Sequence, residues 1–471
     1  MLIRSLSSQL SSRMMTLSRS PRHAAIISQQ CRRLHAPRDK FSNLLSILRE
    51  PHLRTTLHHL ELGDGSDGLI QGLQSPETLE ELKQAIAQAG FLGEWERSAM
   101  LDTLLASLSP TLESIALSPL DWEYLEETKA QREARNEHVP RSGYFFCDFM
   151  GSVSANEETG PFLQSLRTVE FLPDPGSPFC DDRFYEAHDV FASLNLVRGL
   201  RSIKRVIFNA ITESEELSAR PPPQSANYTS IHMEHSSLDY HIPCAAIDSA
   251  KRLEELVLSV DGRGSTDGGQ SLVYPDGIFK SLLSHRDSIQ HLDLDFEDHV
   301  HLRELISPTG LFTSGDMDEE WALCNGDVVE PQYRPGQSPF PSKTLAEFLD
   351  GRSFNDFANL KHLGIGVHLF YHFARGIGSK KGVEHTSLAE GLPQSLETLR
   401  IYGYEKGQRT RQYGVPDLNL DLHIDKFMAE KDAKLPMLKR VEGLEECIPN
   451  GTMVGEPDEQ PEMLWKRKTR G

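Results

Sequence analysis

Histidines beside carboxylates are the residues of this chain whose types and spacing could support chemistry. The run HMEH places His232 and His235 three residues apart, with His241 close behind. Imidazole nitrogens are common zinc ligands, but a zinc site needs a third or fourth ligand in a fixed geometry. The run follows RPPPQSANY, which is rich in turn-forming residues, so we interpret it as a solvated polar loop.

A second pair of histidines lies in FEDHVH, where His299 and His301 follow Glu297 and Asp298. Residues two apart on a strand share a face, so this pair could in principle reach one metal ion. We favour the alternative that the strand ends here and turns into a helix near 302–306. Neither pair leads us to predict a metal site.

No catalytic or cofactor-binding motif appears elsewhere. The run GIGSKKG at 376–382 fits neither phosphate-binding glycine pattern, and we interpret it as a connector. No GxSxG elbow occurs. The six cysteines contain no CxxC pair, and Cys147 lies in the apolar run YFFCDF, which favours packing over reactivity. We therefore predict no catalytic residue, no metal and no cofactor, and a protein that is not an enzyme.

The elements that must position any functional side chain are visible as a repeated six-residue pattern. Its order is apolar, two variable, apolar, one variable, apolar, and each copy predicts a short strand. The last copy is looser by one residue. The nine copies are Leu57/Leu60/Leu62, Leu112/Ile115/Leu117, Leu166/Val169/Phe171, Ile203/Val206/Phe208, Leu253/Leu256/Leu258, Ile289/Leu292/Leu294, Leu360/Leu363/Ile365, Leu396/Leu399/Ile401 and Leu438/Val441/Leu444.

Helical patterns separate many of these predicted strands. They lie near 119–136, 184–194, 276–285, 343–350 and 421–431. A short unit that is repeated and stacked buries its apolar face only against its neighbours. We therefore predict an α/β fold, an irregular leucine-rich-repeat-like solenoid with short parallel strands on the concave side and helices on the convex side.

The predicted solenoid covers residues 41–450. Compositions rich in Pro, Gly and acidic residues predict loop insertions near 211–243, 261–275 and 307–342. Residues 1–40 form a basic leader rich in Arg and Ser, which we expect to be disordered, and residues 451–471 read as a polar tail.

The charge of the chain limits its partners. The formal net charge is −20, which disfavours nonspecific binding to nucleic acid or to an anionic membrane. No apolar stretch is long enough to span a bilayer. The leader resembles a mitochondrial transit peptide in its composition. We expect a cytoplasmic or nuclear protein, with a mitochondrial location as the alternative.

Acidic residues gather on one face of the predicted strands. In SIQHLDLDFED, Asp293, Asp295 and Glu297 alternate with apolar residues and therefore share a face. This face predicts a protein-binding surface that favours a basic partner. Solvated strand positions without a partner are the alternative. The residues predicted to bind the partner are Glu61, Glu170, Asp293, Asp295, Glu297, Arg400 and Tyr402.

Three runs of the chain resemble fungal F-box and leucine-rich-repeat-like proteins. They are FSNLLSILREPHLRTTLHHLELGD, SLAEGLPQSLETLRI and FMAEKDAKLPMLKRVEGLE, which are similar to the entry segment, a repeat unit and the closing unit of that family. The resemblance covers about 41–450, the repeat part. It implies a substrate adaptor of a cullin-type ubiquitin ligase, whose repeats select the target. The sequence has no F-box start motif, so binding to the F-box-binding adaptor of the ligase does not follow from it.

The expected function is therefore protein recognition, with a ubiquitination target as one kind of partner. Two alternatives remain open at this point. One is a mitochondrial α/β enzyme with a cleaved transit peptide, which would require strands that are apolar on both faces. The other is a repeat-only scaffold unrelated to ubiquitination.

Overall fold

A computed structural model describes part of the chain. The described residues are 47, 50–62, 109–117, 150–151, 153–154, 162–171, 186–209, 211–213, 217–234, 236, 238, 241–259, 275–295, 352–374, 387–408, 419–445, 451–454 and 464–467. The predicted leader, the helical patterns near 119–136 and 343–350, the pair His299/His301 and the run GIGSKKG lie outside these residues.

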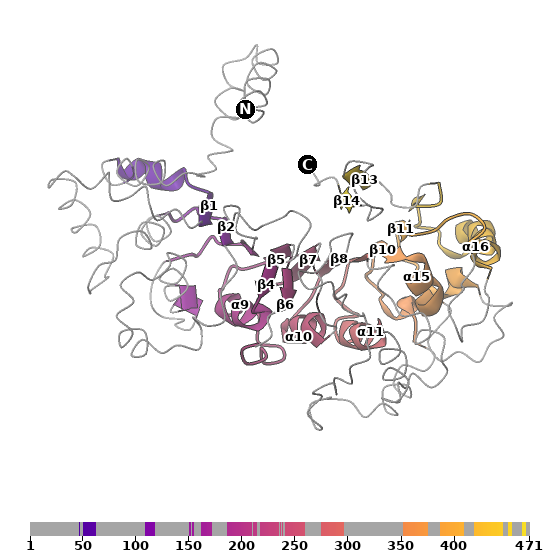
Figure 1. Cartoon of the computed structure of the whole chain (residues 1–471), viewed down its shortest axis with the longest axis horizontal. Coiled ribbons are helices and arrows are strands. Elements are labelled where there is room, and N and C mark those ends of the chain that lie inside the picture. The colour runs from indigo at the N-terminus through magenta and orange to yellow at the C-terminus, as the bar shows by residue number, and fades with distance from the viewer. Residues whose placement is uncertain are drawn as a thin grey trace, which may run out of the picture. The chain divides into compact units, whose positions relative to one another are not determined.

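The protein is an α/β protein built on a ten-stranded sheet (Figure 1). The strand order is β1-β2-β3-β5-β7-β8-β9-β10-β11-β12, which follows the order of the strands along the chain. Each of the nine six-residue patterns coincides with one of these strands. Their bounds are β1 His59–Leu62, β2 Ser114–Leu117, β3 Thr168–Phe171, β5 Arg205–Asn209, β7 Ser230–Glu234, β8 Glu255–Ser259, β9 His291–Asp295, β10 His362–Gly366, β11 Thr398–Tyr402 and β12 Arg440–Glu442.

The chain divides into two compact units. The first comprises Met1–Ser118, Arg132–Val169 and Leu200–Ser202, and it contains β1, β2 and the start of β3. Here β1 pairs parallel with β2, so that Glu61 faces Ala116 in the register. The second unit contains the remaining strands, and β5, β7, β8, β9, β10, β11 and β12 pair parallel one after another.

One backbone contact recurs from strand to strand. A single carbonyl just before the start of one strand accepts two successive N–H groups from the start of the next, at 2.8–3.1 Å. The carbonyl of Lys204 accepts from Thr229 and Ser230, and that of Gln290 accepts from Lys361 and His362. The same contact therefore recurs at equivalent positions of successive strands.

A hydroxyl before the pattern makes a second recurring contact. Ser288 Oγ donates to the carbonyl of Leu253 at 2.6 Å, and Ser395 Oγ donates to that of Leu360 at 2.8 Å. Each serine directly precedes the first apolar residue of its pattern, and each acceptor is the first apolar residue of the preceding pattern. Thr111 makes the same contact with the carbonyl of Leu57 at 3.2 Å. These side chains satisfy carbonyls where the backbone turns into the strand.

Helices connect the strands of the second unit. Figure 1 shows α9 (Val190–Val197), α10 (His241–Ser249) and α11 (Pro275–Leu283) following one another beside β5, β7 and β8. Asp189 caps α9, since its carboxylate accepts from the N–H of Ala192 at 2.9 Å. Further along lie α15 (Val367–Ala374) and α16 (Leu420–Lys434), with the 3-10 segments η4 (Phe354–Asp356) and η6 (Leu388–Gly391). The first unit has a 3-10 segment, η1 (Pro51–Thr55).

A short strand and a buried histidine lie beside α9. Strand β4 (Glu186–His188) pairs with β6 (Ile211–Glu213) in a separate two-stranded sheet. The centroid of the His188 imidazole lies 5.5 Å from the ring centroid of Phe171 and 5.8 Å from that of Phe208. Its Nε2 shares a hydrogen bond of 2.9 Å with Ser193 Oγ. Complete burial lowers the pKa of His188 to about 3, so this side chain is neutral in the folded protein.

Two local predictions were wrong. The region 211–243 is not one loop insertion, because it contains β6, β7 and the start of α10. Residues 184–194 include β4 before α9 begins. Strand β10 ends at Gly366, and the chain continues directly as helix α15. Within the predicted polar tail, 451–471, Gly451–Val454 (β13) and Leu464–Arg467 (β14) form an antiparallel pair.

Within the described part of the chain, no helix has the length and apolar character needed to cross a membrane.

Candidate functional site: the outer face of the sheet

Alternate residues of the strands form in-register rows on one face, which we call the outer face. The middle row runs from β5 to β12 and consists of Ile207, His232, Val257, Asp293, Gly364, Arg400 and Glu442. A second row consists of the first residues of the same strands, Arg205, Ser230, Glu255, His291, His362, Thr398 and Arg440. From β5 to β11, the apolar residues between these positions are buried on the other face. The repeat thus aligns ionisable side chains along neighbouring strands.

One part of the outer face is a cluster centred on Glu255. Its Oε2 accepts hydrogen bonds from Arg205 Nη2 at 2.8 Å and from Ser230 Oγ at 2.6 Å. His232 Nε2 lies 3.3 Å from the same oxygen, an ion-pair distance without the alignment of a hydrogen bond. The other ring nitrogen of His232 contacts Glu234 Oε1 at 2.9 Å. His232 therefore lies between two carboxylates.

The surroundings set the charges in this Glu255 cluster. Burial by itself raises the pKa of Glu255, but the contacts with His232, Ser230 and Arg205 outweigh burial and lower it far below its usual range. Burial by itself lowers the pKa of His232, but Glu234 and Glu255 outweigh it and raise that pKa. An imidazolium whose two nitrogens both face carboxylates has no lone pair for a substrate. His232 is therefore poorly placed to act as a general base.

A second part of the outer face is a hollow of about 410 Å³ over β9 to β12. It is lined by His291, Asp293, His362, Leu363, Gly364, Thr398, Leu399, Arg400, Arg440 and Glu442. Gly364 forms part of its floor, opposite Asp293 on β9 and Arg400 on β11 in the register. Tyr402 Oη donates to Asp293 Oδ1 at 2.8 Å, across β10. A Cβ at Gly364 would lie 2.5 Å from this oxygen and 3.2 Å from Tyr402 Oη. The hydrogen bond therefore requires glycine at this position.

The rim of this hollow bears arginines and histidines. Arg400 Nε donates to Glu442 Oε2 at 2.7 Å, and Arg440 also forms an ion pair with Glu442. His362 shares a hydrogen bond of 2.8 Å with Thr398 Oγ1, and its ring centroid lies 5.6 Å from that of His291. The side chain of Glu442 is 14% exposed, whereas the side chain of Arg440 is 65% exposed. Cationic donors are thus more accessible here than the carboxylate that pairs with them.

The structure places the predicted partner-binding residues as follows. Asp293 and Arg400 line the hollow, and Tyr402 reaches Asp293 through its hydroxyl. Asp295 is half-buried at the last position of β9. Glu170 is half-buried in β3, and Glu61 pairs through its backbone in β1. Glu297 lies outside the described residues. One assumption needs correction, because Asp293 and Tyr402 are 2% and 1% exposed. They bury each other and are not accessible contacts.

Sequence reasoning missed His232 and the second row of the outer face. The prediction of a loop around His232 was wrong, because Tyr228, Ile231 and Met233 repeat the same six-residue pattern. Tyr228 lies midway along the sequence between Ile203 and Leu253, and each of these two residues begins a pattern. The spacing therefore also reveals the copy of the pattern that begins at Tyr228. Glu255, His291 and His362 directly precede the second apolar residue of their patterns. That position would have identified the second row.

The described residues pair one serine with a neutral histidine, Ser193 with His188, but both side chains are fully buried and no substrate can reach them. No group of three or more His, Cys, Asp or Glu side chains in the described ranges is arranged to hold a metal ion. Ser230 Oγ donates to the carboxylate of Glu255, which is no general base for it at this low pKa. No protein-family model matches the chain, and no curated protein matches it with significance.

Proposed function

We propose that this chain is a protein-recognition scaffold, a leucine-rich-repeat-like solenoid that binds its partner through the outer face. The observation that supports this most directly is the pair of in-register rows, which align ionisable side chains over neighbouring strands from β5 to β12. Such a surface suits an extended partner that contacts several repeats at once. The carbonyl and hydroxyl contacts that recur between successive strand segments support the repeat architecture.

The charges of this face favour an acidic contact segment on the partner. Glu255 and Glu442 already have arginine partners, and Asp293 accepts from Tyr402. Arginine side chains are the more exposed members of these pairs, with Arg205 at 42% and Glu255 at 18%. A partner therefore meets guanidinium groups first, and these bind carboxylates well. This reverses the basic partner expected from the composition of the strands.

The proposal is tested by affinity capture with matched variants. Arg205→Gln combined with Arg440→Gln removes two exposed charges from the outer face. Arg252→Gln is the control, because Arg252 is similarly exposed and pairs with its near neighbour Glu254 at 3.0 Å. We expect a defined set of captured proteins to be lost with the double variant and retained with the control, in a salt-dependent manner. An identical set from all three proteins would refute binding through this face.

The narrower proposal is that the partner is a ubiquitination target. It is supported by the resemblance of the repeat runs to fungal F-box and leucine-rich-repeat-like proteins. One of those runs contains Ser395, whose hydroxyl donates to the carbonyl of Leu360 in the preceding six-residue pattern. The test is whether the F-box-binding adaptor of a cullin ligase co-purifies with the chain. Capture of partners without that adaptor would leave a repeat-only scaffold and remove the ligase role.

A further inference from the structure

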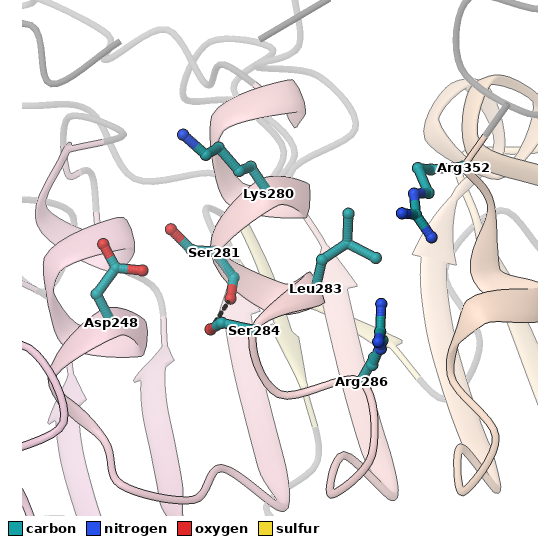
Figure 2. Close-up of a pocket in the computed structure, with 7 residues that line it drawn as sticks. All are labelled: Asp248, Lys280, Ser281, Leu283, Ser284, Arg286 and Arg352. Carbon is teal, nitrogen blue, oxygen red and sulfur yellow. Dashed lines mark hydrogen bonds between the residues drawn. The ribbon is translucent and has the colours of Figure 1, made fainter. Parts of the chain in front are cut away.

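A second hollow, of about 270 Å³, lies among the helices of the second unit, and we call it the helix hollow. It is lined by Asp248, Lys280, Ser281, Leu283, Ser284, Arg286 and Arg352 (Figure 2). Asp248 belongs to α10, and Lys280 to α11. Arg286 follows α11, and Arg352 arrives from a distant part of the chain, just before η4. The volume is well above the roughly 10–15 Å³ that one water molecule needs.

The lining of the helix hollow is cationic in an acidic protein. Lys280, Arg286 and Arg352 are basic and Asp248 is acidic, whereas the whole chain has a net charge of −20. The carboxylate of Asp248 already pairs with Arg220 at 2.9 Å. Burial lowers the pKa of Lys280, because the charged ammonium loses solvation beside this hollow. Of the charged residues that line the hollow, three are basic and one is acidic, which favours an anion.

Two guanidinium groups point toward one another across the helix hollow. Figure 2 shows the side chains of Arg286 and Arg352 converging beside Leu283. Arg352 is held in place, because its Nη1 donates to Asp356 Oδ1 at 3.1 Å and Asp356 belongs to the capping box of η4. Arg286 has a loose ion pair, 3.9 Å from Nε to the exposed carboxylate of Asp287. Each guanidinium has five N–H donors, so an anion between the two could accept from groups that these single contacts do not use.

We propose that the helix hollow binds a phosphoryl group, with Arg286 and Arg352 as a clamp and Lys280 as a further positive charge. Two guanidinium groups from different elements reach different oxygens of a tetrahedral dianion, which is the geometry that arginine recognises well. Inorganic phosphate and a phosphorylated side chain share this chemistry. The site is separate from the outer face, and it does not depend on the function proposed for that face.

The test is binding of inorganic phosphate to the full chain, measured by calorimetry at constant ionic strength. Wild-type protein is compared with Arg286→Gln, Arg352→Gln and the control Arg252→Gln. We expect each clamp variant to weaken binding at least tenfold and the control to leave it unchanged. Asp248→Asn should strengthen binding several-fold, because it removes a carboxylate that repels the anion. Circular dichroism verifies that each variant is folded.

A second arm identifies the source of the phosphoryl group. A phosphoserine peptide and its unphosphorylated form are titrated in the same way. Tighter binding of the phosphopeptide than of phosphate assigns the site to a modified protein, and equal binding assigns it to a free phosphate. No binding of either ligand to the wild type would overturn the proposal. Equal affinity of the clamp variants and the control would also overturn it, since the anion would then bind elsewhere on the protein.

Discussion

Acidification should destabilise this protein through His188. The folded-state pKa of this buried imidazole is about 3, compared with 6.5 in an unfolded chain. Between these values the unfolded state binds a proton that the folded state does not bind. Stability is therefore fully present above pH 6.5 and is lost as the pH falls toward 3. One pH unit in this window corresponds to about 1.4 kcal/mol, so His188 alone accounts for about 2 kcal/mol between pH 8 and pH 5.

The assay is urea unfolding, followed by circular dichroism at several pH values from 8 to 5. Wild-type protein is compared with His188→Gln, whose side-chain amide can still reach Ser193 but does not titrate. His58→Gln, which removes an exposed histidine, is the control. The loss of unfolding free energy on acidification should be about 2 kcal/mol smaller for His188→Gln than for the wild type.

The comparison uses the change of the unfolding free energy with pH, so any cost of the substitution that does not depend on pH cancels. Other groups that titrate in this range, such as His232 with its raised pKa, contribute equally to both proteins. Parallel curves for the wild type and His188→Gln would refute the reasoning. They would mean that the imidazole beside Phe171 and Phe208 gains a proton without cost, and hence that it is hydrated in the folded protein.

Three further predictions concern the outer face and the serine contacts between successive strand segments. Gly364→Ala should lower the unfolding free energy by roughly 2–4 kcal/mol, because the new Cβ would push apart the two side chains whose hydrogen bond crosses β10. Tyr402→Phe, measured by the same urea titration, should lower the unfolding free energy by less, because it adds no atoms. Ser288→Ala and Ser395→Ala should each cost about 1 kcal/mol in urea unfolding, the net value of one such bond. Glu255→Gln should cost roughly 2 kcal/mol at pH 7, because a charged arginine and histidine lose their common acceptor.

Each of these predictions has an outcome that contradicts it. Equal stability of Gly364→Ala and the wild type would mean that β10 shifts to make room. A serine variant without any loss would show that water replaces the hydroxyl at that carbonyl. A stable Glu255→Gln would show that the cluster around Glu255 is solvated and contributes little.

Much of the sheet could be predicted from the sequence. Leu292 and Leu294, or Leu399 and Ile401, alternate with polar residues because one face of a strand is buried, and that period of two is local information. The in-register row from Val257 to Arg400 also followed from the pattern, since equivalent positions of a repeat face one another in a parallel pair. The strand β7, which the prediction missed, has the same six-residue pattern, beginning at Tyr228.

The state of the outer face could not be predicted in this way. Asp293 reads as an exposed acid, and only its position opposite Gly364 allows Tyr402 to reach over and bury it. His188 reads as an ordinary polar residue, and its low pKa comes from burial beside aromatic rings on two other strands. The helix hollow depends on Arg286 and Arg352, which are far apart in the sequence and meet only in the folded chain.

The sequence by itself therefore determined where the repeated strands begin, which of their residues are apolar and which positions share a register. Tertiary structure alone decided which charged groups are paired, which are buried and which converge on a hollow. The physical reason is that periodicity acts between neighbours along the chain. A pKa, an ion pair or a binding site instead depends on desolvation and on distances between residues from different strands and helices.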